Sequence, residues 1–482
     1  MSAGNDITKF VREEAGSVLT FWAASLVVFM GLLALTFDFG RMAATQSELQ
    51  AFADNVALAA AGELDGASDA ITRATAAAET LISDTQTFGS GDKTLGGSGD
   101  YTISFYNGLP DSDTDDMATF ATTDPAEAGY VRVVANDQSI ALGFGAAFAA
   151  LSNTDEMGNT VGAEAVAGMT RSYCDITPLM FCLPSSDFKA EDNIGKSILL
   201  RAGGNGAAWG PGAFGFIDPS SNQIDDGGPC MGLTGSNLDT CLIAAAGQRT
   251  GCFAKSGIDI ATGQRVGNFE PALNVRFDIF LGSMNSNNSN PDYAPAPSVI
   301  KGYKPSGQCL KSNAAPSTDS IGMPPDDCHG DATCDRYGDG DWTDGRQNYV
   351  NINYGGSDPH PTADTRYEYY LAEIDAAGGP TSTNDIISSP TESGRPTCSA
   401  HQSPDPDRRV LVAAGVDCSA HGVGGGEKNV PVKEFYKIFM ISPVGLDGTR
   451  DLWVEIVGPA GGTGGGGADA GSTFSDVVRL YR

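Results

Sequence analysis

Four aspartates lie close together in the stretch CDRYGDGDWTDG, residues 334–345, and oxygen ligands of this kind are those that calcium prefers. They are Asp335, Asp339, Asp341 and Asp344. The stretch departs from the EF-hand pattern, because the twelfth position counted from Asp339 is Val350 rather than glutamate. Two interpretations stay open at this point: a calcium-binding loop, or a solvated turn of aspartate and glycine.

Ten cysteines form the second set of residues with possible chemistry, and all of them follow residue 173. An even number in one part of the chain predicts disulfides and an oxidising compartment. Zinc is the alternative, but there is no CxxC motif, and Cys328-His329 with Cys334 is an incomplete ligand set. We expect two local bridges, Cys174–Cys182 and Cys398–Cys418. The other pairings stay open.

Motifs of the common enzyme classes are absent from the sequence. It contains no HExxH, GxSxG or P-loop, and the glycine-rich stretch at 203–210 lacks the GxGxxG spacing. Its four histidines fall in expected loops, so we expect no enzyme and keep a periplasmic hydrolase only as an alternative. The formal net charge of −31 also argues against binding nucleic acid through bulk electrostatics.

An uncharged apolar run covers residues 15–37, and about 20 such residues suffice to cross a membrane. The run is longer than the apolar core of a signal peptide, so we favour an uncleaved anchor over a cleaved leader. Lys9 and Arg12 precede it and Arg41 follows it. This bias predicts that residues 1–14 are cytoplasmic and that the chain beyond the span lies outside, where disulfides survive.

The stretch after the apolar run has the spacing of a helix. Leu49, Phe52, Val56 and Ala60 recur at steps of three and four residues and form one face. We expect one helix from about residue 9 to 64 and a second over 68–83. The apolar face packs either on its own domain or on the helix of a partner, and the sequence leaves both possibilities open.

Beyond residue 100 the pattern indicates strands. Runs at 101–106, 129–137 and 159–171, with a short apolar helix at 140–151, predict a small α+β module spanning 38–172. The long helix is expected to pack on its sheet. For residues 173–482 the pattern predicts a loop-rich, mostly antiparallel β region that is cross-linked by disulfides. Its expected strands are 197–202, 273–281, 368–374, 408–416, 434–444, 451–458 and 477–482. The fold class is therefore α+β.

The N-terminal region also resembles the TadG-like proteins of tight-adherence (Tad/Flp) pilus assembly. That family has an apolar span, then Asp-x-Gly-Arg, then an alanine-rich helix beginning Leu-Gln. The matching residues here are Asp38, Gly40, Arg41, Leu49, Gln50, Asp54, Ala57, Leu58, Ala59, Ala60 and Ala61. Phe52 and Asn55 stand where the family usually has alanine, and both are compatible with a helix.

The resemblance implies a non-catalytic accessory protein of a Tad/Flp pilus system, held in the bacterial inner membrane by one span, with its bulk in the periplasm. Other pilus components are the implied partners. Prepilin peptidase processing is not expected, because Phe21 stands five residues after Gly16 where an acid is needed. A von Willebrand A metal site is not expected either, because Ala141 replaces its second serine. A calcium- or glycan-binding surface adhesin is the alternative function.

Overall fold

The computed structural model describes residues 15–481 with short internal gaps. The gaps fall at residues 81–82, 87–92, 97–98, 111, 113–114, 126, 141, 145–159, 175, 203–208, 220–227, 248–251, 256, 262–268, 447–448 and 461–473. The chain divides into two units, one of residues 1–170 with 476–482 and one of residues 171–475. The sequence-based division at 172/173 placed the last residues of the chain in the second region, whereas the structure places them in the first.

The first unit combines two helices with antiparallel strands. Its elements are α2 (Ala15–Ala61), α3 (Ala70–Thr80), β1 (Ser83–Gln86), β2 (Lys93–Gly96), β3 (Tyr101–Tyr106), η1 (Met117–Phe120), β4 (Tyr130–Ser139), β5 (Thr160–Cys174) and β13 (Phe474–Leu480). β1 and β2 form a hairpin, and the main sheet has the order β13–β5–β4–β3. The short apolar helix expected at 140–151 lies largely outside the described residues.

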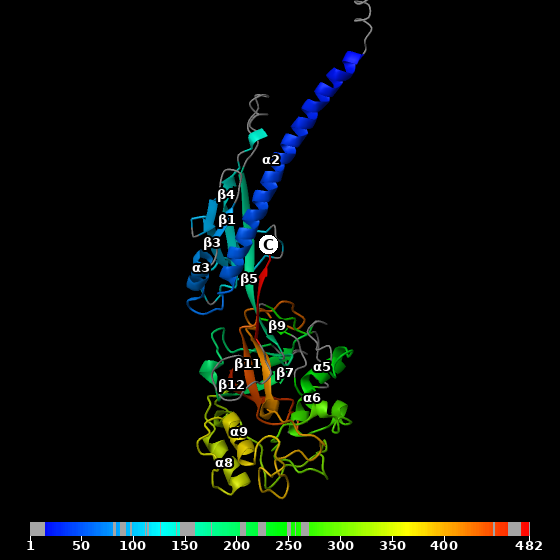
Figure 1. The fold of residues 1–482 in the computed structure, drawn as a ribbon. Coiled ribbons are helices and arrows are strands. Elements are labelled where there is room, and N and C mark those ends of the chain that lie inside the picture. The colour runs from blue at the N-terminus through cyan, green and yellow to red at the C-terminus, as the bar shows by residue number, and fades with distance from the viewer. Residues whose placement is uncertain are drawn as a thin grey trace, which may run out of the picture. The chain divides into compact units, whose positions relative to one another are not determined.

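Helix α2 is one continuous helix of 47 residues (Figure 1). No proline interrupts it, and alanine, the best helix former, dominates its second half. Within the part of the chain that the structure describes, no helix is both long enough and apolar enough to span a bilayer. The transmembrane helix expected over residues 15–37 is therefore not confirmed.

The C-terminal half of α2 packs on the main sheet of its own unit (Figure 1). Leu49, Phe52, Val56 and Ala60 have no exposed surface, and Phe52 meets the ring of Tyr101 edge-on at 6.2 Å. Strands β4 and β5 present their helix-facing side chains at every second residue: Val131, Val133, Ala135, Ala163, Ala165 and Ala167. Small alanines on both elements allow the helix and sheet backbones to approach closely.

The second unit is built around a closed barrel of six strands in the order β10–β11–β12–β7–β8–β6. These strands are β6 (Leu179–Cys182), β7 (Ser197–Ala202), β8 (Ala213–Phe216), β10 (Val410–Val416), β11 (Glu434–Met440) and β12 (Leu452–Pro459). β7–β8 and β6–β10 are parallel pairs, and the other four pairs are antiparallel. The expectation of a mostly antiparallel β region thus agrees with the barrel.

Helices and one short strand surround the barrel. They are η2 (Glu191–Asn193), α5 (Gly235–Ala244), β9 (Cys252–Ala254), α6 (Phe269–Asn274), η5 (Val275–Phe277), η6 (Gly282–Met284), η7 (Pro291–Tyr293), α7 (Asp327–Gly330), α8 (Thr343–Tyr354), α9 (Arg366–Ala376) and η8 (Pro406–Arg409). The two faces of β12 contribute to two different hydrophobic clusters. Val454 and Ile456 belong to the larger cluster, which includes residues of α6, whereas Trp453 and Val457 pack with residues of α8 and α9.

Two expected strands are helical in the structure. Residues 273–277 of the first run form the end of α6 and then η5, the chain turns at Asp278 with a left-handed φ of 62°, and residues 279–281 have no regular secondary structure. The Asp278 carboxylate accepts the backbone N–H groups of Thr397, Cys398 and Ser399, and this tertiary contact outweighs the β propensity of the run. The run 368–374 lies in α9, which begins with a capping box formed by Thr365 and Glu368.

All ten cysteines form disulfides, as expected, but both predicted local pairings are wrong. The bonds are Cys174–Cys252, Cys182–Cys418, Cys230–Cys241, Cys309–Cys398 and Cys328–Cys334. Strand pairing explains the first two. Cys174 lies opposite Cys252 in the β5–β9 register, and the parallel pairing of Val416 with Cys182 brings Cys418 beside Cys182. Register between distant strands, rather than sequence proximity, sets these bonds.

The helix–sheet contact gives a matched test within α2. Val56→Asp places a carboxylate in a fully buried apolar contact and should cost about 3 kcal/mol or more in free energy of unfolding. Asn55 is exposed on the same turn, and Asn55→Lys should change stability by about 0.5 kcal/mol or less. Denaturant unfolding and protein levels of the full chain measure both. Equal, small effects would contradict the described burial of Val56.

Candidate functional sites

The polar residues of the α2 motif connect the helix to strand β5. The side-chain amide of Gln46 donates to the Gly162 carbonyl at 2.7 Å, and that of Gln50 donates to the Glu164 carbonyl at 2.8 Å. Asp54, one turn further on, accepts a second hydrogen bond from Gln50 and so orients its amide. These residues therefore fix the helix on the sheet, which is a structural role for this part of the motif.

The Asp-x-Gly-Arg part of the motif lies further toward the N-terminus of α2. Asp38 is buried, and its Oδ2 accepts the backbone N–H of Phe144 at 3.1 Å. The ring of Phe144 also meets Phe37 edge-on at 6.1 Å. Asp38 thus ties a segment more than a hundred residues away to the helix, at the point where the buried half of α2 begins.

In the second unit, the four predicted calcium ligands are all exposed, and three of them take part in turns or a helix start. Asp339 accepts the N–H of Asp341, and Asp341 accepts both the N–H and the hydroxyl of Thr343. Asp344 lies in the first turn of α8, where acidic residues favour the positive end of the helix. Asp335 is exposed, and its charge contributes to the raised pKa of Arg201.

The geometry does not bring these four carboxylates into one ligand group. Among the described residues, potential metal-ligand triads are Asp326–Cys328–His329 and Cys328–Cys334–Asp339, so only Asp339 of the predicted set takes part. Both triads use sulfur atoms of the Cys328–Cys334 disulfide, which are not available as thiolate ligands. The described geometry therefore does not support a calcium site made of these four aspartates.

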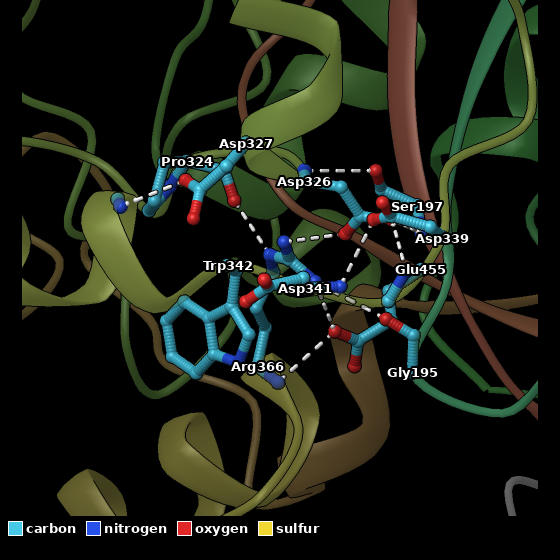
Figure 2. Close-up of polar contacts among 12 residues, drawn as sticks. Gly195, Ser197, Pro324, Asp326, Asp327, Asp339, Asp341, Trp342, Arg366 and Glu455 are labelled. Atoms are coloured by element: carbon cyan, nitrogen blue, oxygen red, sulfur yellow. Dashed lines mark hydrogen bonds and ion pairs between the residues drawn. The ribbon is translucent and has the colours of Figure 1, made fainter. Parts of the chain in front are cut away.

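Beside this loop, a buried arginine binds two buried carboxylates (Figure 2). Arg366, at the start of α9, lies 2.6 Å from Asp326 Oδ1 and 3.0 Å from Glu455 Oε2 through its two terminal nitrogens, and none of the three side chains is exposed. The guanidinium also donates to the carbonyl oxygens of Pro324 and Gly195 and lies 4.9 Å from the Trp342 ring centroid. We call Arg366, Asp326 and Glu455 the Arg366 network.

The remaining carboxylate oxygens of the network are satisfied by backbone groups. Asp326 Oδ2 accepts the N–H groups of Ser197 and Gly340, and Glu455 Oε1 accepts that of Tyr367. Burial raises the pKa of Glu455, although the charge of Arg366 and the hydrogen bonds from Tyr367 and Arg366 oppose that change. The network is closed to solvent and fully hydrogen-bonded, which is the pattern of a structural ion cluster rather than of a reactive site.

Glu373 is a second buried carboxyl group, on the following turns of α9. Its Oε1 accepts the hydroxyls of Tyr349 at 2.6 Å and Tyr354 at 2.7 Å, whereas its Oε2 is buried with no hydrogen-bond partner in the described chain. Burial raises the pKa of Glu373 to about 7, although the two tyrosine hydrogen bonds oppose that change. This group therefore changes its charge near neutral pH.

Three of the four histidine rings have described contacts, and none of these contacts supports the hydrolase alternative. His329 meets Trp453 edge-on at 4.8 Å, His360 meets Tyr369 at 5.1 Å, and Nε2 of His401 lies 3.1 Å from the carbonyl oxygen of Ser289. In none of these contacts does a serine hydroxyl meet the imidazole, as nucleophilic catalysis by a serine would require.

Neither the Arg366 network nor Glu373 was expected from the sequence. One local signal was available, the Thr365-x-x-Glu368 capping box, which marks the start of a helix. It would have predicted a helix instead of the expected strand at 368–374. No local signal marks the partners of Arg366. Asp326 and Glu455 lie 40 and 89 residues away in the chain, so their meeting depends on the fold.

Removal of the Arg366 guanidinium should destabilise the second unit. Arg366→Met leaves two buried carboxylates without their cation, which typically costs about 3–5 kcal/mol. Lys428→Met is the control, because it removes an ion pair with Asp259 whose side chains are 62% and 38% exposed and should cost far less. Urea unfolding of the full chain compares them. A loss from Arg366→Met as small as that from Lys428→Met would contradict the described burial.

Glu373 predicts a pH dependence of stability. Its folded pKa of about 7 exceeds the ordinary value of 4.5, so the unfolded chain loses this proton first as pH rises. The contribution of protonated Glu373 to the free energy of unfolding is complete below about pH 4.5. As the pH rises from there to about pH 7, the free energy of unfolding falls by about 3 kcal/mol. Glu373→Gln cannot titrate and should lose this slope. Unfolding measured from pH 4.5 to 8 tests it, and parallel curves for the two proteins would contradict it.

Comparison with known proteins identifies one matching region. Residues 16–63 match the family model described as Flp pilus-assembly TadE/G-like. The matched residues are almost the whole of α2, including its buried face and the glutamines that bind β5. No curated protein and no solved structure matches the chain. The resemblance to the TadG-like family of Tad/Flp pilus assembly, predicted from the α2 motif, is thus confirmed over residues 16–63.

Proposed function

We propose that this chain is a membrane-anchored accessory protein of a bacterial Tad/Flp pilus assembly system. In this proposal residues 15–37 lie in the inner membrane, residues 1–14 in the cytoplasm and residues 38–482 in the periplasm. It acts by contacts with other pilus components and not by catalysis. The family match supports the pilus-related role, and the exposed apolar half of α2 supports the anchor.

The two halves of α2 differ in how their apolar residues are used. The second half buries one face on its own sheet, whereas large apolar side chains between residues 19 and 39 are exposed. These are Leu19, Phe21, Trp22, Leu26, Val28, Phe29, Leu32, Leu35, Phe37 and Phe39, from 40% to 75% exposed. An exposed apolar surface of this size marks an interaction site in most soluble proteins.

The distribution of these side chains around the helix favours lipid over a single protein partner. Neighbouring residues of a helix point about 100° apart, and both Phe21–Trp22 and Val28–Phe29 are exposed pairs of neighbours. A partner helix would need one apolar stripe, whereas lipid contacts every side. The same continuous helix then carries the folded first unit, so the anchor and the periplasmic part are joined without a flexible linker.

The orientation rests on the disulfides. All five bonds lie in residues 174–418, and such bonds persist in the periplasm but are reduced in the cytoplasm. Lys9 and Arg12, which precede the apolar run, also favour a cytoplasmic N-terminus by the positive-inside rule. The adhesin alternative has no comparable observation in its favour, because its calcium ligands do not converge.

Membrane fractionation tests the anchor, and reporter fusions test the orientation. Leu26→Arg with Phe29→Arg should move the full chain out of the membrane fraction, because each charge at the centre of a span costs about 2.5–3.5 kcal/mol. Asn55→Lys is the control and should stay with the membrane. A reporter active only in the cytoplasm, fused after residue 100, should be inactive. Piliation should fail with the double variant.

An active cytoplasmic reporter would contradict the orientation. Continued membrane association of the double arginine variant would contradict the anchor. Normal piliation in cells that lack the whole chain would contradict the pilus-assembly role, whatever the location of the protein.

A further inference from the structure

Besides Arg366, four arginines of the second unit are almost completely buried. They are Arg276, Arg395, Arg408 and Arg409, between 1% and 6% exposed. Three of them donate to backbone carbonyl oxygens: Arg395 to Pro297 at 3.0 Å, Arg408 to Ala294 at 2.8 Å and Arg409 to Met440 at 3.1 Å. A buried guanidinium normally needs such acceptors, because its five N–H groups lose their water on folding.

Arg276, in η5, is the exception. Its Nε and Nη1 are both buried, and neither has a hydrogen-bond partner among the residues that the structure describes. Each unsatisfied buried donor costs about 1–3 kcal/mol, and more when the group is charged. A folded protein that keeps such a group normally holds an ion or a water molecule against it.

One other positive charge, that of Arg408, acts on the Arg276 guanidinium. The segment 294–297 joins three of the arginines: the Ala296 N–H donates to the Arg276 carbonyl at 3.0 Å, and the carbonyls of Ala294 and Pro297 accept from Arg408 and Arg395. Burial, and then repulsion by Arg408, lowers the pKa of Arg276. The closest acidic residue in the sequence, Asp278, uses its carboxylate on the backbone of 397–399.

We propose that Arg276 binds a small monovalent anion of chloride size. A water molecule could accept hydrogen bonds from these N–H groups but would leave the charge beside Arg408 uncompensated, whereas an anion satisfies both the hydrogen bonds and the charge. A small ion is required because both orphaned nitrogens are shielded from solvent. The site would be a structural anion site of the second unit, and it does not depend on the proposed pilus function.

Thermal melting of the full chain at constant ionic strength tests the proposal. Sodium chloride replaces sodium gluconate, whose anion is too large for an enclosed site. The melting temperature of the wild type should rise with chloride and saturate after a few degrees, because a ligand of the folded state stabilises it. Arg276→Met should abolish that rise. Arg450→Met, which removes a 67% exposed side chain, is the control and should retain it.

A wild-type melting temperature that does not respond to chloride would overturn the proposal, as would an equal response in Arg276→Met. If Arg276→Met fails to fold, crystals of the wild type soaked in bromide decide the matter. An anomalous peak within hydrogen-bond distance of the Arg276 guanidinium supports the site. Ordered water at that position, with no anomalous peak, overturns it.

Discussion

One buried cation, Arg366, joins separate elements of the second unit. Arg366 of α9 binds Glu455 of β12 and Asp326 beside α7, and Asp326 in turn accepts backbone hydrogen bonds from β7 and from the acidic loop. Three buried charges are tolerable only when they meet with good geometry. The barrel, the loop before α8 and the helix α9 must therefore adopt one arrangement together, and a change in any of them would leave an uncompensated charge in the interior.

The same physical constraint recurs in the long irregular segments. The segments between η7 and α7 and between α9 and η8 contain no helix or strand. A buried ion pair of Lys301 with Glu392 at 3.6 Å and the disulfide Cys309–Cys398 join them. The buried guanidinium groups of Arg395 and Arg408 donate to the backbone carbonyls of Pro297 and Ala294. In a helix or a sheet, backbone N–H groups would make these hydrogen bonds. Polar and covalent cross-links thus replace regular secondary structure here, whereas the first unit relies on an apolar helix face and two glutamine amides.

The two units carry different parts of the functional argument. The family match covers α2, so the relation to pilus assembly rests on a helix that is half buried on its own sheet and half exposed. The barrel unit contains most of the charged and disulfide-bonded residues and lies outside the matched region. Its closed ion network and five disulfides cross-link the unit internally.

The sequence by itself determined the elements whose signals are local. The spacing of Leu49, Phe52, Val56 and Ala60 indicated the buried face of α2, the alternation in 101–106 indicated β3, and an even set of late cysteines indicated disulfides. Only the tertiary structure decided which cysteines pair, because strand register joins Cys182 to Cys418 across 236 residues. It also decided the conformation of 273–281, where a tertiary contact at Asp278 outweighed β propensity. The helix over 368–374 did have a local signal, the capping box of Thr365 and Glu368. Arg366 and Arg276 have no local signature at all, since the energy of a buried charge depends on groups that are distant in the chain and meet only after folding.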